Sequence, residues 1–111
     1  MVLKMKDKLL PLGTIVRVKK TAILMVVGYG MQNTIDKKIY DYSAVAFPMG
    51  LDVNEIKLFN KSDIDEIIFI GYQTDKSIEY RKIIDDYVKD IKSGVPVDDA
   101  AKKIREMIGE K

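Results

Sequence analysis

The feature that most constrains the fold is a pair of short segments, each of which is predicted to form a strand that is apolar on both faces. Residues 22–29 read AILMVVGY, and residues 66–72 read EIIFIGY. Runs of β-branched and aromatic residues of this length, bounded by glycine, are typical of β-strands. Exposing one apolar face of such a strand to water is unfavourable. We therefore expect the sheet that contains these strands to be covered on both sides.

Three further segments complete a set of short strands. The pattern predicts strands over 14–19, 22–29, 39–47, 56–59 and 66–72. Pro48 ends the third strand, since proline cannot donate to a ladder, and residues 32–38 form a polar hairpin tip. Gly28 and Gly30 predict a bulge or a close backbone approach near the end of the second strand. Short connections favour an antiparallel meander.

Helical periodicity replaces the strand pattern after Gln73. Apolar residues then recur at helical spacing from Ile78 to Ile91, and Gly94 is placed to end this helix. Asp98 is placed to cap a second helix. We expect the first helix to cover the outer face of the sheet with an apolar stripe. The stripe consists of Ile83, Ile84, Tyr87, Val88 and Ile91.

These elements predict an α+β fold. It comprises a small, bent antiparallel sheet of about five strands, SH3-like and barrel-like, followed by a C-terminal two-helix hairpin. We assign 10–72 to the antiparallel β domain and 76–109 to the helical hairpin packed on it. The whole chain of 111 residues is then a single compact domain.

The composition removes several classes of chemistry. The chain contains no cysteine and no histidine, which excludes disulfides, thiolate metal sites and every Ser-His or Cys-His nucleophile. No apolar run is long enough to span a membrane, and we do not expect the N-terminal residues to act as a secretory signal. We therefore predict a non-enzymatic cytoplasmic protein without catalytic residues, metal or cofactor. Export together with a partner stays open.

Charge is unevenly distributed along the chain. Residues 1–20 carry six lysines and arginines against one aspartate, a pattern compatible with nucleic acid or an acidic partner. A solvated terminus is the favoured interpretation. Asp63, Asp65 and Glu66 form an acidic cluster after Ser62. We interpret the cluster as the cap of one helical turn rather than as a metal site.

The six tyrosines are the candidate partner-binding residues. Exposed aromatic side chains on small barrels stack nucleic-acid bases, although half-buried tyrosines are common on any sheet. We favour a protein partner, and keep a nucleic-acid-binding or regulatory small barrel as the alternative. A homodimer is also left open. The candidate residues are Tyr29, Tyr40, Tyr42, Tyr72, Tyr80 and Tyr87.

Four segments resemble a domain-of-unknown-function family of small proteins from Gram-positive bacteria. They read LPLGTIVRVK (10–19), ILMVVGYG (23–30), YDYSAVAFPMG (40–50) and FNKSDIDEIIFIGY (59–72). Members of this family are often encoded beside type VII secretion systems and LXG polymorphic toxins. The resemblance implies an accessory, chaperone or targeting protein that binds a secreted toxin or another secretion component. It brings no catalytic residues and does not cover the helical hairpin.

Overall fold

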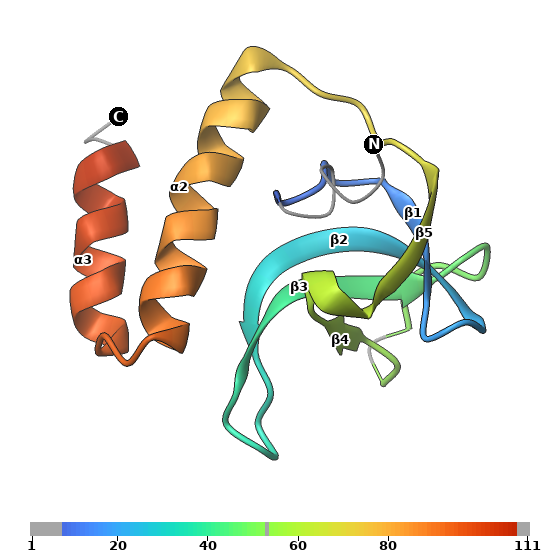
Figure 1. Cartoon of the computed structure of the whole chain (residues 1–111), viewed down its shortest axis with the longest axis horizontal. Coiled ribbons are helices and arrows are strands. Elements are labelled where there is room, and N and C mark those ends of the chain that lie inside the picture. Colours follow the sequence, from blue (N-terminus) through green and yellow to red (C-terminus); the bar gives the residue numbers. More distant parts are fainter. Residues whose placement is uncertain (1–7, 53, 109–111) are drawn as a thin grey trace.

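The computed structural model describes residues 8–52 and 54–108, and its fold is α+β (Figure 1). Lys4 and Lys6 of the basic N-terminal stretch and residue 109 of the predicted hairpin lie outside the described residues. The strands are β1 (Ile15–Val18), β2 (Ala22–Gln32), β3 (Ile39–Ala46), β4 (Lys57–Phe59) and β5 (Ile64–Phe69). A short 3-10 helix, η1 (Lys61–Asp63), precedes β5, and the helices α2 (Asp75–Lys92) and α3 (Val97–Ile108) follow it.

The strands form one open antiparallel sheet in the order β4-β3-β2-β1-β5. Strands β1 to β4 follow the predicted meander, whereas β5 returns across the sheet to pair with β1. The predicted barrel-like closure is wrong, because β4 and β5 share no ladder in the described part of the chain. A strand of only three residues, β4, offers few ladder bonds for closing a sheet. The η1 turn carries the chain from one edge towards the other instead.

A bulge divides β2, as the glycines predicted. The pairing of β2 with β3 shifts register between Val26 and Gly28. A Cβ atom at Gly28 would lie 2.5 Å from the Ser43 hydroxyl oxygen, so a larger residue there would force the Ser43 side chain to move. Beyond the bulge β2 continues to Gln32, three residues further than predicted, and Tyr29 pairs with Tyr42. The bulge therefore places Tyr29 on the same face as its partner Tyr42, which carries the core.

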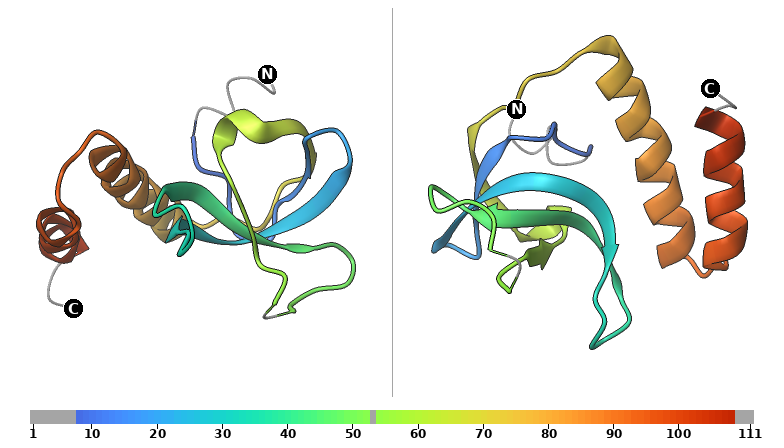
Figure 2. Two further views of the ribbon diagram at one scale, coloured as in Figure 1. Left: turned by 90° about the horizontal axis from the view of Figure 1, so that it is seen from below. Right: turned by 180° about the vertical axis from the view of Figure 1, so that it is seen from behind.

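The core contains a segment that belongs to no strand. Leu9 and Leu10, in the chain before β1, are only 5% and 3% exposed. The segment of chain that precedes β1 runs between β2 and α2 (Figures 1 and 2). The Tyr42 hydroxyl accepts a 2.8 Å hydrogen bond from the Leu10 amide. The Tyr29 hydroxyl donates to the Leu10 carbonyl. The sheet therefore supplies the hydrogen bonds that a buried backbone outside a ladder requires.

Helix α2 packs on the sheet with its predicted stripe, but it leaves part of the outer face uncovered. Ile84 packs against the core cluster, and Val88 is 1% exposed. The chain after β5 passes close to Leu12 and Thr14 at Gly71 and then runs to the start of α2 (Figure 1). On the outer face, Val27 and Phe69 remain 42% and 58% exposed.

Helix α3 lies outside α2, away from the sheet (Figures 1 and 2). Gly94 follows the C-cap residue Ser93 with a φ of +108°, which confirms its predicted place at the end of the first helix. Asp98 lies in the first turn of α3 rather than at its cap, because the helix begins at Val97.

The acidic cluster contributes structural bonds. Asp63 accepts a 2.9 Å hydrogen bond from the Asn60 amide, so the capped turn begins two residues earlier than predicted from Ser62. Asp65 accepts from the Lys20 amide. Glu66 pairs with Arg17 at 3.0 Å. The three carboxylates thus bond to three different parts of the fold.

The packing of α2 on the sheet predicts a specific loss of stability for Val88→Ala. Truncation of this fully buried side chain should lower the free energy of unfolding by about 1–3 kcal/mol, measured by urea denaturation. Lys102→Ala, at an exposed position on α3, is the control and should leave it unchanged. An unchanged midpoint for Val88→Ala would contradict the packing of α2 on the core.

Burial of the Tyr29 side chain predicts a pH dependence of stability. Burial raises the pKa of Tyr29 to about 12, although the nearby Arg81 cation lowers it, and burial also raises that of Tyr42. An unfolded tyrosine loses its proton near pH 10. The stabilisation from the neutral hydroxyl is therefore complete below that pH and is lost as pH rises through the folded pKa.

Tyr29→Phe should accordingly lower the free energy of unfolding by about 0.5–1.5 kcal/mol at neutral pH, because the hydrogen bond to the Leu10 carbonyl is lost. The difference from wild type should shrink above about pH 10, measured by urea denaturation across the pH range. Tyr72→Phe, which removes an exposed hydroxyl, should follow wild type throughout. A Tyr29→Phe deficit that stays constant to pH 12 would contradict this account.

Candidate functional site

A small apolar pocket gathers residues from four parts of the chain. Its volume is about 130 Å³, and we call it the tyrosine pocket. Three side chains of its rim are exposed: Leu12 (53%), Tyr72 (85%) and Tyr80 (47%). These three exposed side chains converge on one hollow, which makes the pocket a candidate interaction surface. The pocket is lined by Leu12, Tyr29, Tyr72, Ser77, Tyr80 and Arg81.

One side of the pocket depends on a close backbone approach at Gly71. A Cβ atom at this position would lie 2.1 Å from the Leu12 carbonyl oxygen and 2.9 Å from the Thr14 nitrogen. The Gly71 amide donates a 2.9 Å hydrogen bond to the buried Thr14 hydroxyl. Only glycine lets the two segments cross this closely, and the crossing brings Leu12 and Tyr72 to the same pocket.

The other side of the pocket is the first turns of α2. The Thr74 hydroxyl accepts a 3.0 Å bond from the Ser77 amide, and the Ser77 hydroxyl accepts a 2.9 Å bond from the Thr74 amide. These reciprocal bonds satisfy amides that a helix start leaves without partners. The Ser77 hydroxyl also accepts a 3.2 Å bond from Arg81 Nη1. The helix cap therefore helps to position the arginine.

Arg81 is the buried centre of the site, with 9% of its surface exposed. Its Nε donates to the Leu9 carbonyl at 3.1 Å, and its Nη2 donates to Gln73 Oε1 at 2.6 Å. Its bonding partners are thus a carbonyl, a hydroxyl and an amide oxygen. No carboxylate among residues 8–52 and 54–108 pairs with it. The guanidinium carries five N–H donors, of which three are used here.

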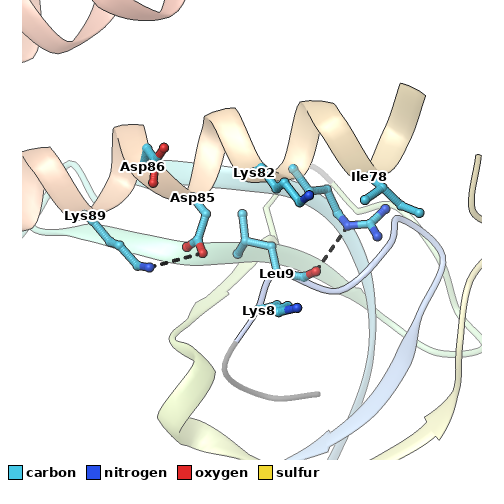
Figure 3. Close-up of a pocket in the computed structure, with 8 residues that line it drawn as sticks. Lys8, Leu9, Ile78, Lys82, Asp85, Asp86 and Lys89 are labelled. Carbon is cyan, nitrogen blue, oxygen red and sulfur yellow. Dashed lines mark hydrogen bonds and ion pairs between the residues drawn. The ribbon is translucent and has the colours of Figure 1, made fainter. Parts of the chain in front are cut away.

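Arg81 also lines a second, larger pocket of about 490 Å³ beside the N-terminal segment (Figure 3). We call it the basic pocket. Asp85 is neutralised by Lys61 at 2.8 Å and Lys89 at 3.6 Å, and Asp86 projects away from the segment. Lys8 and Lys82 form no ion pair with the described residues, so positive charge dominates. The lining residues are Lys8, Leu9, Ile78, Arg81, Lys82, Asp85, Asp86 and Lys89.

The structure brings together three of the six candidate tyrosines. Tyr29, Tyr72 and Tyr80 line the tyrosine pocket. Tyr40 lies on β3, where its hydroxyl donates to Asp36 of the hairpin tip at 2.8 Å. Tyr87 is half-buried on α2 near Gly30.

Tyr42 is fully buried, with 0% of its surface exposed. Its ring stacks on Phe59 with centroids 5.1 Å apart and lies 6.0 Å from the ring of Tyr29. A ring enclosed in this way can serve neither as a partner contact nor as a stacking platform for a base. Its part in the site is to hold the Leu10 amide.

The sequence interpretation missed Arg81, although a signal for it exists. Arg81 falls on the same helical stripe as Ile84 and Val88, at spacings of three and seven residues. Charged side chains are rarely buried without a partner, so a cation on an apolar stripe indicates a specific partner inside the fold. Here that position faces the Leu9 carbonyl, a contact between residues far apart in the sequence that no local pattern could reveal.

The described residues limit the other kinds of site. Within 8–52 and 54–108, no group of three carboxylates lies close enough to hold a metal ion. Over the same residues, neither helix has the length and apolar character needed to cross a bilayer. The tyrosine pocket and the adjoining basic pocket, which share Arg81, are therefore the candidate binding site.

The close approach at Gly71 predicts that Gly71→Ala is strongly destabilising, because the added methyl group meets backbone atoms. We expect a loss of about 3 kcal/mol or more in the free energy of unfolding. Thr14→Val removes only the hydrogen bond to the Gly71 amide and should lower the free energy of unfolding by about 1–3 kcal/mol. Both are measured by thermal and urea denaturation. A Gly71→Ala variant as stable as wild type would contradict the observed crossing.

Comparison with known proteins identifies the family. The family model described as "Domain of unknown function (DUF4176)" matches residues 9–80, a range that extends past the motifs of 10–72 into α2 and includes Tyr80. The comparison with curated proteins gave no match, and neither did that with solved structures. Since the matched range is well over half of the chain, the protein belongs to the DUF4176 family of domains of unknown function.

Proposed function

We propose that the protein is a non-enzymatic binding protein that holds a segment of a protein partner at the tyrosine pocket. The supporting observation is the exposed rim of Leu12, Tyr72 and Tyr80 above the buried Arg81. Tyrosine and arginine are the residue types that most often dominate the energetics of protein interfaces. A rim fixed by the crossing at Gly71 and by the α2 cap also loses little conformational entropy on binding.

We further propose that the partner is a secreted toxin, or another component, of a type VII secretion pathway. This part of the proposal draws on the resemblance of 10–72 to proteins encoded beside LXG toxins. The protein then acts in the cytoplasm as an accessory, chaperone or targeting factor before export. The alternative, a nucleic-acid-binding small barrel, has less support, because Tyr42 is enclosed and Tyr40 is bonded to the hairpin tip.

Truncation of the pocket rim tests the binding proposal. The protein is co-expressed with an LXG toxin encoded beside its gene, and the complex is measured by size-exclusion chromatography and titration calorimetry. Tyr80→Ala and Tyr72→Ala should each weaken binding by about tenfold or more, as expected for truncated interface anchors. Tyr40→Ala is the matched control, because this tyrosine lies outside the pocket, and it should bind as wild type does.

Two outcomes would contradict the proposal. If the protein and the toxin never co-elute and toxin export is unchanged when the gene is deleted, the secretion role fails. If they form a complex that Tyr80→Ala and Tyr72→Ala leave intact, the pocket is not the binding site. The nucleic-acid alternative is tested separately by single-stranded DNA and RNA at low salt, where such binding is strongest.

A further inference from the structure

The charge of Arg81 lacks a counter-ion in the described part of the chain. The guanidinium is nine-tenths buried and bonds to three neutral oxygens: Leu9 O, Ser77 Oγ and Gln73 Oε1. Burial of a cation is costly unless it is paired or fully hydrogen-bonded. The three bonds hold the side chain in one orientation and leave two N–H donors for another acceptor. The group is thus pre-organised for an anion.

The surroundings of Arg81 favour an anion as well. Lys8 and Lys82 line the adjoining basic pocket and form no ion pair with the described residues. Asp85 is engaged by Lys61 and Lys89. The basic pocket is thus lined by four cations and by two carboxylates, Asp85 and Asp86, and its net positive charge attracts a negatively charged ligand.

The tyrosine pocket lies directly beside this charge and suits an apolar group of limited size. Its volume of about 130 Å³ corresponds to roughly four water molecules, which is room for one branched aliphatic side chain and too little for a helix or a strand. Arg81 forms part of its wall. A ligand that fills the pocket therefore lies against Arg81.

We infer that the site recognises an acidic–aliphatic segment of a protein partner: Arg81 binds a carboxylate, and the tyrosine pocket takes the aliphatic side chain beside it. This inference rests on the proposed function and specifies the chemistry of the partner. Arginine suits the carboxylate because its fork of N–H donors matches the two oxygens. The partner is expected to bind more weakly as salt is raised.

A pair of small probes tests the recognition of the carboxylate. N-acetyl-L-leucine carries an isobutyl group and a carboxylate, whereas N-acetyl-L-leucinamide carries the same isobutyl group and no charge. Each is titrated into the whole protein, and the NMR signals of Arg81 Nε–H and of the Tyr72 and Tyr80 rings are followed. The acid should bind in the millimolar range and about tenfold more tightly than the amide, because charge-assisted hydrogen bonds are the stronger ones.

Two variants assign the effect to Arg81. Arg81→Gln should remove the preference for the acid and leave the weak binding of the amide. Because this variant also loses the contact with Leu9 and can fail to fold, Tyr80→Ala provides a second measure, since its side chain is exposed. It should weaken both probes to a similar degree. Lys102→Ala on α3 should leave both affinities unchanged.

Several results would overturn the inference. Equal affinities for acid and amide, or no saturable shift with either, would show that Arg81 is only a structural donor to Leu9. A stronger response to inorganic phosphate than to the acid would assign the site to phosphate. Shifts that grow with protein concentration alone would assign it to a second copy of the chain. If the toxin complex forms but acid and amide bind equally, the proposed function stands and only this inference fails.

Discussion

The structure depends on the hydrogen bonding of one buried segment that belongs to no sheet. Leu9 and Leu10 are enclosed, so their backbone groups need partners that a ladder does not supply. Tyr29 and Tyr42 provide them from the sheet, and Arg81 provides one from α2. The segment therefore joins the two halves of the fold, and leaving its polar groups unpaired would cost more than the bonds themselves contribute.

This junction also accounts for the position of the candidate site. The same guanidinium that bonds to Leu9 lines both pockets, and the chain that follows Leu10 supplies the Leu12 rim. The crossing at Gly71 fixes that rim against Tyr72. A surface held by backbone contacts on both sides is rigid before a partner arrives, and rigidity of this kind lowers the entropic cost of association.

Local patterns predicted most of the elements, and long-range contacts decided the rest. The strands, the bulge at Gly28 and the helix end at Gly94 follow from signals within a few residues. The open sheet depends on the pairing of β5 with β1, and the position of α2 depends on the segment Leu9–Leu10. The periodicity of the sequence predicts neither of these contacts. At the site, the choice of tyrosines as candidates included three of the lining residues. Arg81 was not predicted, because its partner Leu9 lies 72 positions away in the sequence.

Hydrogen exchange at the Leu10 amide tests the central role of this segment most directly. The amide donates to the buried Tyr42 hydroxyl and lies outside every ladder. If the segment is part of the core, this amide should exchange only through global unfolding, as slowly as the most protected amides of β2 and β3. Rapid exchange at Leu10 while β2 and β3 stay protected would show that the segment detaches, and would contradict the account.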